Sequence, residues 1–262
     1  MVHPLIIIGS NGFIGRNFSR AFPDALAVGR NSLDLYQPNI QFTTQGRSYA
    51  LIAAGIGNPR KCEVDPHYSY QCNVVGTLKL GKELSERGII PIFFSSDYVF
   101  DDVLRIAPLN TYGRQKAELE AGASQMDALV IRLSKVYGIE KGDGTLFDEM
   151  AAKLIRGESI LAARDQIFAP IFVGDVIRQI MTCVETGKRG IVNCVGSRSA
   201  SRLEMARCLA EVLQAKENLV KEISLDELKD GVKRPKYLKL SSDFPTLSWE
   251  EGVKLVGKAY AQ

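Results

Sequence analysis

The sequence is poor in metal-binding side chains and in long apolar runs. Two histidines, His3 and His67, are too few for a histidine-rich metal site. The five cysteines are odd in number, far apart and without a Cys-x-x-Cys pair, which indicates reduced structural thiols. No apolar run approaches the roughly 20 residues of a membrane helix, and a first strand expected near Leu5 leaves no room for a signal peptide. We therefore expect a soluble, cytoplasmic protein without a metal site.

The charge of the chain is small and dispersed. The formal net charge is +3 over 262 residues, and the basic residues do not form runs, so binding to nucleic acid or to a membrane surface is not indicated. Hydrophobic residues make up 45% of the chain, which is enough to bury a substantial core. This length and composition suit one large domain, or one domain with a smaller lobe.

Short apolar runs alternate with helical patterns through the first two thirds of the chain. The expected strands are residues 5–8, 25–28, 49–54, 89–94 and 128–133. The expected helices between and after them are residues 13–22, 67–87 and 111–124. Such alternation predicts an α/β fold with a Rossmann-type, doubly wound parallel sheet covered on both faces. A ligand then lies beyond the carboxyl ends of the strands.

After Gly138 the alternation becomes less regular. We expect a helix near residues 146–156, a return to the sheet within residues 172–195, and mainly helices from about Ser201, including residues 203–213. The pattern predicts a dinucleotide-binding domain built from residues 1–140 and 168–196. Residues 141–167 and 197–262 are then expected to form a small substrate-binding lobe.

Three glycines follow the first apolar run in the string LIIIGSNGFIG. Gly9 lets the chain reverse, Gly12 lets the backbone approach a pyrophosphate, and Gly15 lets the helix pack closely on the strand. The helix then presents unpaired N–H groups and its positive end to the anion. Glycine-rich turns also occur without ligands, but this one opens a strand–helix–strand pattern, which is the context of a dinucleotide site.

A tyrosine and a lysine stand four residues apart, at Tyr112 and Lys116. That spacing places both side chains on one face of a helix. A neighbouring ammonium is expected to favour the ionised phenol, which poises the tyrosine to exchange a proton. Ser96, at the end of the strand before this helix, supplies a third polar group; Ser95 is the rival for that role. Alone, the tyrosine–lysine spacing is common on surface helices.

These strings together resemble the extended short-chain dehydrogenase/reductase superfamily, which includes nucleotide-sugar epimerases and dehydratases. SSDYVFD from Ser95 and PLNTYGRQKAELE from Pro108 resemble most closely the dTDP-4-dehydrorhamnose reductase family. RLSKVYG, DQIFAPIFVGDVI and KRPKYLKLSSD resemble its later landmarks more loosely, and the similarity runs from about Leu5 to Asp243. The turn GFIG is closer to the epimerase form.

The resemblance implies an oxidoreductase of polysaccharide biosynthesis that reduces a 4-keto-6-deoxy sugar carried on a nucleoside diphosphate. Ser96, Tyr112 and Lys116 would be the catalytic residues. The glycine turn and the resemblance together give the cofactor-binding residues Gly9, Asn11, Gly12, Phe13, Ile14, Gly15, Arg30, Asp34, Leu35, Ala53, Ala54, Gly55, Asn73, Ser95, Tyr112 and Lys116. The implied substrate-binding residues are Ser96, Asp97, Tyr98, Lys135, Asp165, Gln166, Ala169, Pro170 and Arg234.

The choice of cofactor depends on the end of the second expected strand. Arg30 stands there and can pair with a 2′-phosphate, which favours NADP(H). Asp34 lies about 20 residues beyond the glycines. An acidic side chain there would accept hydrogen bonds from the free 2′-hydroxyl of the adenosine ribose of NAD(H). In the string LDL it instead resembles a position that contacts adenine. NADP(H) is therefore expected, with NAD(H) as the alternative.

Two other functions fit the same motifs. An epimerase or dehydratase would use the same three catalytic residues with a tightly held NAD, although no Asp-Glu pair for removing water stands between Ser96 and Tyr112. A non-catalytic NADP-binding regulatory subunit would use only the fold, whereas here all three residues are present. A nucleotide sugar is the expected small-molecule partner, and pairing with a second copy as a homodimer is possible.

Overall fold

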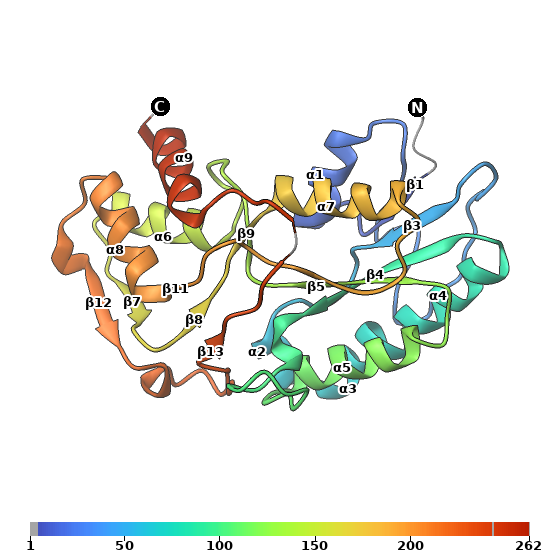
Figure 1. Ribbon diagram of the computed structural model, residues 1–262, viewed down its shortest axis with the longest axis horizontal. Coiled ribbons are helices and arrows are strands. Elements are labelled where there is room, and N and C mark those ends of the chain that lie inside the picture. The colour runs from blue at the N-terminus through green and yellow to red at the C-terminus, as the bar shows by residue number, and fades with distance from the viewer. Residues whose placement is uncertain (1–4, 243, 262) are drawn as a thin grey trace.

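The computed structural model describes residues 5–242 and 244–261, so His3 and Asp243 lie outside the described residues. At its centre is a parallel six-stranded sheet in the order β10-β5-β4-β3-β1-β2 (Figure 1). Its strands are β1 (Leu5–Ile8), β2 (Leu26–Val28), β3 (Tyr49–Ile52), β4 (Ile90–Ser96), β5 (Leu129–Leu133) and β10 (Gly190–Cys194). After β1 the chain forms β2 next to it on one side and then crosses over to form β3 next to it on the other side. A crevice at this switch point is the usual ligand site of such sheets.

Helices cover both faces of the sheet (Figure 1). One face carries α1 (Phe13–Ala21) and α7 (Val173–Glu185). The other carries α2 (Pro59–Val64), α3 (Pro66–Tyr70), the π-helical segment η1 (Gln71–Gly76), α4 (Thr77–Glu86) and α5 (Thr111–Ala123). Alternate residues of β1 point to the two helix layers that cover the sheet. Ile7 packs with Phe18 of α1 on one face, and Ile8 packs with Leu80 of α4 on the other. The apolar run 5–8 is therefore buried throughout.

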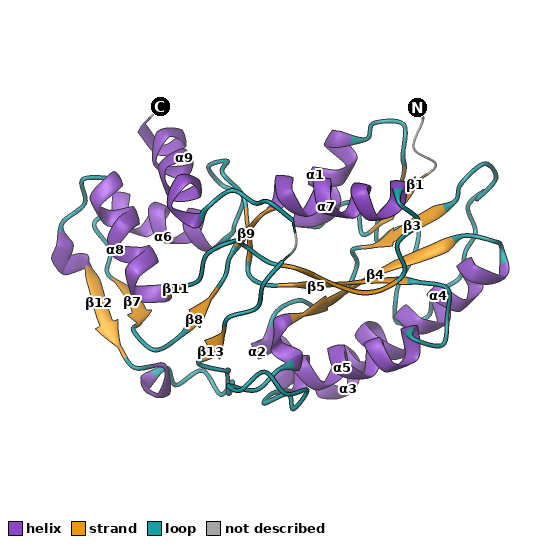
Figure 2. Cartoon of the chain, viewed as in Figure 1, coloured by secondary structure: helices purple, strands orange, loops and turns teal. Residues whose placement is uncertain are grey.

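A second part of the molecule is built from helices and short strands that all lie after residue 145 (Figure 2). Its helices are α6 (Leu146–Ile155), α8 (Arg202–Val212) and α9 (Trp249–Ala261), with the short turns η3 (Glu217–Leu219) and η4 (Leu225–Glu227). Its strands are β7 (Ile160–Ala163), β8 (Ile167–Phe168), β11 (Ala200–Ser201), β12 (Val220–Ile223) and β13 (Tyr237–Leu238). Phe147, Met205 and Val253 share its apolar core. Below, this part is called the lobe.

Between the two parts lie β6 (Val136–Tyr137), which pairs with β9 (Ile171–Phe172), and the short helix η2 (Asp97–Val99) at the end of β4. The lobe draws on both stretches expected for it, since α6 and β7 precede residue 168 and α8 and α9 follow residue 197. The domain boundaries themselves stay a prediction. No helix of residues 5–242 and 244–261 is long and apolar enough to cross a membrane.

The expected doubly wound α/β fold is confirmed, with differences in two places. The helix expected over residues 67–87 is interrupted by the π-helical segment η1. There Gly76 packs against the backbone of Leu35 so closely that an added Cβ would lie 1.6 Å from its carbonyl oxygen. The region after Ser201, expected to be mainly helical, also contributes β12 and β13. Both strands pair with segments from before residue 169, a contact that local periodicity does not reveal.

Candidate active site

The glycine turn connects β1 to α1 at the switch point of the sheet. Gly9 has a positive φ of 88°, and an added Cβ would lie 2.4 Å from the backbone nitrogen of Ala54. A Cβ on Gly15 would lie 2.2 Å from the carbonyl oxygen of Gly9, so this glycine lets α1 approach the turn. Gly12 is different, because its Cβ would meet only the Gly9 oxygen, at 3.4 Å. The turn therefore keeps open space at the position expected to face a pyrophosphate.

The end of β3 lies directly against this turn. Ala53 donates its backbone N–H to the Ile8 carbonyl at 2.8 Å, and Gly55 has a φ of 143° that few other residues adopt. The buried side chain of Asn73 holds the next residue, accepting from the Ile56 N–H at 2.7 Å and donating to its carbonyl at 3.1 Å. Asn73 thus fixes the loop after Gly55, and its contacts do not include Lys116.

The end of β2 approaches the turn from the other side. Gly9 and Ser10 both donate their backbone N–H groups to the carbonyl of Val28. Two residues further on, exposed Arg30 donates to the Tyr68 hydroxyl at 3.1 Å. The exposed Asp34 carboxylate accepts the N–H of Tyr36 at 3.0 Å. Of these two charged residues, Arg30 is closer in sequence to the end of β2 than Asp34 is.

Leu35 was expected to contact the cofactor as well. Its side chain is buried among the apolar residues between the sheet and α4. Phe13 and Ile14, at the start of α1, are partly buried, and Asn11 is exposed at the tip of the turn beside Gly29. The turn therefore presents Asn11 and Gly12 to solvent.

Tyr112 and Ser96 meet where β4 ends and α5 begins. The Ser96 hydroxyl donates to a carboxylate oxygen of Asp97 at 3.0 Å and accepts the N–H of Tyr98 at 3.2 Å. Burial and the neighbouring Asp97 raise the pKa of the Tyr112 phenol well above its usual range, although the nearby Ser96 hydroxyl opposes the rise. Burial also raises the pKa of Asp97 to about 6, against Ser96 and the charge of Lys135. Tyr112 is thus held as a protonated donor.

Lys116 lies on α5 with Tyr112, as the spacing predicts. Its ammonium lies 5.6 Å from the centre of the Tyr112 ring and donates to the Phe94 carbonyl at 2.8 Å. Burial lowers the pKa of this ammonium to about 8, while Cys62 and Glu120 oppose the change. The expectation that this ammonium favours an ionised phenol stays a prediction; burial is the main influence on Tyr112 and raises its pKa.

Ser95, the rival serine, points away from Tyr112. Its hydroxyl donates to Glu120 at 2.5 Å, and Glu120 also accepts two hydrogen bonds from Arg132, at 2.8 and 2.7 Å. Successive residues of a strand face opposite sides of a sheet, which gives Ser95 and Ser96 different neighbours. The buried Glu120–Arg132 pair therefore fastens α5 to β4 and β5 beneath the candidate catalytic residues.

Four further contacts place the start of α5. The Asn110 side chain accepts the Gly113 N–H at 2.8 Å, as a helix N-cap, and donates to the Lys233 carbonyl at 2.8 Å. Glu63 of α2 accepts the N–H of Thr111 at 2.7 Å. A Cβ on Gly113 would lie 2.2 Å from the Tyr98 carbonyl oxygen, so only glycine permits this approach of α5 to η2. These contacts fix the backbone on both sides of Tyr112.

Tyr98 lies next to Tyr112 and near Arg234 of the segment before β13. The two rings meet edge to face, with centroids 6.2 Å apart. Tyr98 lies within electrostatic reach of Arg234, whose guanidinium pairs with Asp230 through two hydrogen bonds. Lys135, which follows β5, interacts electrostatically with both Asp97 and Arg234. The expected substrate residues Asp97, Tyr98, Lys135 and Arg234 are thus brought together beside Tyr112.

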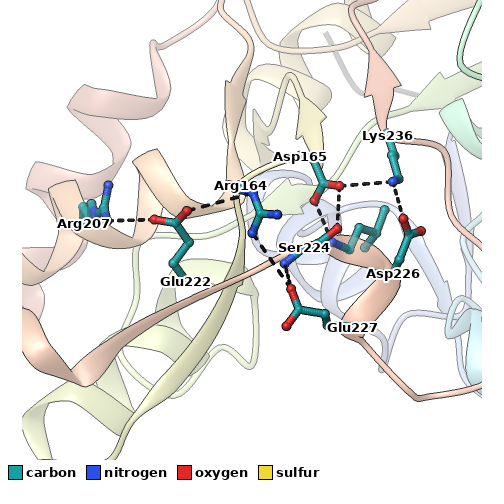
Figure 3. Close-up of polar contacts among 9 residues, drawn as sticks. Arg164, Asp165, Arg207, Glu222, Ser224, Asp226, Glu227 and Lys236 are labelled. Atoms are coloured by element: carbon teal, nitrogen blue, oxygen red, sulfur yellow. Dashed lines mark hydrogen bonds and ion pairs between the residues drawn. The ribbon is translucent and has the colours of Figure 1, made fainter.

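Asp165 has a different environment, inside a polar network of the lobe (Figure 3). Its carboxylate accepts from the Ser224 hydroxyl at 2.9 Å and the Leu225 N–H at 2.6 Å, and pairs with Lys236 at 3.2 Å. Burial would raise the pKa of Asp165, but these hydrogen bonds outweigh it and lower the pKa to about 2. These contacts account for Asp165 without a ligand.

The three other lobe-side residues expected to face substrate are buried, namely Gln166, Ala169 and Pro170. The carbonyl oxygen of Ala169 accepts the N–H of Gly196, and the carbonyl of Pro170 would lie 2.1 Å from a Cβ on Gly196. Gln166 uses its backbone carbonyl to accept the N–H of Arg202. Contacts with Gly196 therefore hold Ala169 and Pro170 in place, and their role toward substrate stays a prediction.

Sequence reasoning missed two residues of this region. Asn110 could have been found, because it is a preferred N-cap type directly before the helix that carries Tyr112. Arg202 could not, since only the tertiary structure brings the start of α8 near Tyr98. In residues 5–242 and 244–261, no group of three or more histidine, cysteine or acidic side chains could hold a metal ion.

Comparison with known proteins identifies relatives along the whole chain. The model of the RmlD substrate binding domain family matches residues 3–260. A dTDP-4-dehydrorhamnose reductase from Mycolicibacterium smegmatis is 27% identical over 97% of this chain and 85% of its own length. The crystal structure of dTDP-4-dehydrorhamnose reductase from Bacillus anthracis, in complex with NADP, has a TM-score of 0.86 at 24% identity, covering 97% of this chain and 98% of that one.

A relative with a different description is methionine adenosyltransferase 2 subunit beta from Rattus norvegicus. It is 28% identical over 200 residues, which cover 70% of this chain and 59% of its own length. Relatives of this chain are therefore described both as reductases and as a subunit of another enzyme.

Proposed function

The chain belongs to the RmlD substrate binding domain family, and from this premise we propose that it reduces a nucleoside diphosphate-linked 4-keto-6-deoxy sugar with NADPH. The observation that carries the proposal is the placement of Tyr112 and Lys116, with 5.6 Å between the ring centre and the ammonium, on the helix that follows β4 and Ser96, along the sheet edge where the glycine turn opens. The relatives described as dTDP-4-dehydrorhamnose reductases support the same activity.

The residues present fit a dinucleotide along this edge. Gly12 leaves room for a pyrophosphate at the start of α1, and Arg30 offers a guanidinium for a 2′-phosphate. The backbone of Ala53 to Gly55 would lie beneath the nucleotide, and Lys116 would hold the ribose next to the nicotinamide. When bound, the reduced nicotinamide supplies a hydride to the substrate carbonyl carbon.

The protein supplies the proton and the geometry. Tyr112 donates its phenolic proton to the carbonyl oxygen, and its raised pKa keeps that proton in place until the oxygen becomes basic. Ser96 orients this oxygen with its hydroxyl, which requires the Ser96 hydrogen to turn from Asp97 toward the substrate. Asp97 and Tyr98 line the sugar side, and the cations Lys135 and Arg234 face the diphosphate.

The proposal predicts net consumption of NADPH by the purified protein. Mixing it with nucleoside diphosphate-linked 4-ketosugars should lower the absorbance of the reduced nicotinamide for at least one substrate. NADH should react more slowly. Absence of turnover with every ketosugar and both cofactors would reject the reductase assignment. Tightly bound NAD in the purified protein, without net turnover, would instead indicate an epimerase.

Arg30→Asp should weaken the binding of NADPH by about tenfold or more and leave that of NADH nearly unchanged. A carboxylate there repels the 2′-phosphate, whereas the arginine forms a charge-assisted hydrogen bond worth about 1.5–3 kcal/mol. Fluorescence titration of the two cofactors measures both constants. Arg20→Asp is the control, because it makes the same charge change at the exposed far end of α1. Equal losses for the two cofactors would exclude the phosphate contact.

A regulatory role is the second candidate, and the similarity to methionine adenosyltransferase 2 subunit beta favours it. A regulatory subunit would bind NADP without turnover and would associate with a different enzyme. The first experiment separates the two functions.

We also infer a cytoplasmic location, which is supported by five cysteines that all remain free in the fold.

A further inference from the structure

Tyr68 of α3 connects two side chains that lie beyond the end of β2. Its hydroxyl accepts a hydrogen bond from the Arg30 guanidinium at 3.1 Å. Its ring stacks on that of Tyr36, with centroids 5.5 Å apart and an angle of 20° between the planes. Arg30 and Tyr36 follow β2, whereas Tyr68 belongs to a helix after β3, so only the folded chain brings the three side chains together.

The phenol of Tyr68 is held in place from several sides. Its ring packs against the apolar residues between the sheet and α4, whereas Arg30 is exposed. The backbone N–H of Tyr68 donates to the Asp65 carboxylate at 2.9 Å, at the N-terminus of α3. The phenolic oxygen is therefore a fixed acceptor, and its hydrogen bond restrains an arginine side chain that would otherwise sample many rotamers.

The Arg30 guanidinium has a neutral partner and no carboxylate partner. It forms no ion pair within residues 5–242 and 244–261, and its side-chain hydrogen bond there is the one to Tyr68. Asp34 is the next acidic residue along the chain, and its carboxylate accepts the Tyr36 N–H instead. The other N–H groups of the guanidinium are thus available to an anion, and their planar arrangement fits phosphate oxygens.

This guanidinium stands at the adenosine end of the dinucleotide site. The Val28 carbonyl accepts the backbone N–H of Gly9 at 2.8 Å, so the end of β2 lies against the glycine turn. A Cβ on Gly29, directly before Arg30, would lie 3.2 Å from the side-chain nitrogen of Asn11 in that turn. A dinucleotide whose pyrophosphate meets the start of α1 places its adenosine ribose beside the end of this strand.

We propose that Tyr68 orients the Arg30 guanidinium toward the 2′-phosphate and thereby sets the preference for NADP(H) over NAD(H). The inference rests on the proposed function and adds a positioning residue to it, since Tyr68 acts through Arg30. A guanidinium that is ordered before the phosphate arrives loses less conformational entropy on binding. NAD(H) carries a neutral hydroxyl at the same place and gains less from an oriented cation.

Calorimetric titration of NADP+ and NAD+ tests this role without turnover. Tyr68→Phe keeps the stacked ring and removes the hydroxyl, so the affinity for NADP+ should fall about three- to tenfold, the contribution of one hydrogen bond. The affinity for NAD+ should change by less than about twofold.

Tyr36→Phe is the matched control from the same pair of rings. Its hydroxyl makes no hydrogen bond within the described part of the chain, and phenylalanine preserves the stack on Tyr68. Neither cofactor affinity should change by more than about twofold in this variant.

A double-mutant cycle separates positioning from packing. In an Arg30→Met background, which lacks the guanidinium, Tyr68→Phe should no longer change the affinity for NADP+. Unchanged NADP+ affinity of Tyr68→Phe alone, an equal loss in both backgrounds, or tighter NADP+ binding would each overturn the role of Tyr68. Unaltered protein that binds NAD+ as tightly as NADP+ would overturn it too, although a reductase that uses NADH would survive that result. None of these titrations needs a ketosugar, so their outcome is independent of the reductase assignment.

Discussion

Tyr112→Phe should lower turnover by about 10²–10⁴-fold while the protein stays folded and still binds NADPH. The substitution removes one hydroxyl, the only proton-donating atom of this side chain, and keeps the ring that packs against Tyr98. A positioned general acid contributes about that factor to a rate. Steady-state kinetics, with cofactor titration and a thermal melt on the same preparation, measure all three quantities.

Tyr70→Phe provides the control for this result. Tyr70 ends α3 and donates its hydroxyl to Glu118 at 2.5 Å, so the same atom is lost at a distance from Ser96. Its activity should remain within about twofold of the unaltered protein, as for most surface substitutions. Turnover that survives in Tyr112→Phe would show that another group supplies the proton. Asp97 would then be the next candidate, because its carboxyl pKa of about 6 lets it carry a proton near neutral pH.

Gly113→Ala should reduce both stability and activity. The new methyl group would lie 2.2 Å from the Tyr98 carbonyl oxygen and 2.9 Å from Pro108, and neither the backbone nor the proline ring can turn away. Overpacking of this kind costs about 1–3 kcal/mol. If α5 moves outward instead, Tyr112 moves with it, and a shift of about 1 Å at a reacting group can cost about 10²-fold in rate. Denaturant unfolding and kcat report the two effects.

Gly122→Ala makes the same change nine residues later on α5. Its methyl group would lie 2.5 Å from a terminal carbon of Leu78, which can rotate to another conformer. Alanine also favours a helix over glycine by about 1 kcal/mol. We therefore expect Gly122→Ala to keep its activity and most of its stability. If the two variants behaved alike, the contact between Gly113 and Tyr98 would not be what places Tyr112.

The sheet and the glycine turn could be predicted from the sequence because their signals are local. A buried parallel strand is a short apolar run, as in residues 5–8, and the spacing of Gly9, Gly12 and Gly15 reflects contacts within one turn. The helical spacing of Tyr112 and Lys116 is equally local. Each of these predictions needed only the geometry of a single strand, turn or helix.

The remaining features depend on distant parts of the chain. The pKa of Tyr112 is raised by burial, which spacing along a helix cannot reveal. Arg202 is about 100 residues from Tyr98 in sequence, and only the folded chain brings the two side chains within electrostatic reach. The contacts of Asp165 with Ser224 and Leu225 are also long-range, so the sequence could not reveal them.

The side chain of Asn110 joins α5 to the segment that carries Arg234. Its amide oxygen caps α5, the helix that carries Tyr112, and its amide nitrogen donates to the Lys233 carbonyl. The Asn110 side chain is almost fully buried. A chimera that takes its lobe from another family member would have to reproduce this carbonyl at the same place. Exchange of substrate preference by lobe grafting should therefore succeed only when the donor segment keeps the backbone course of residues 230–236.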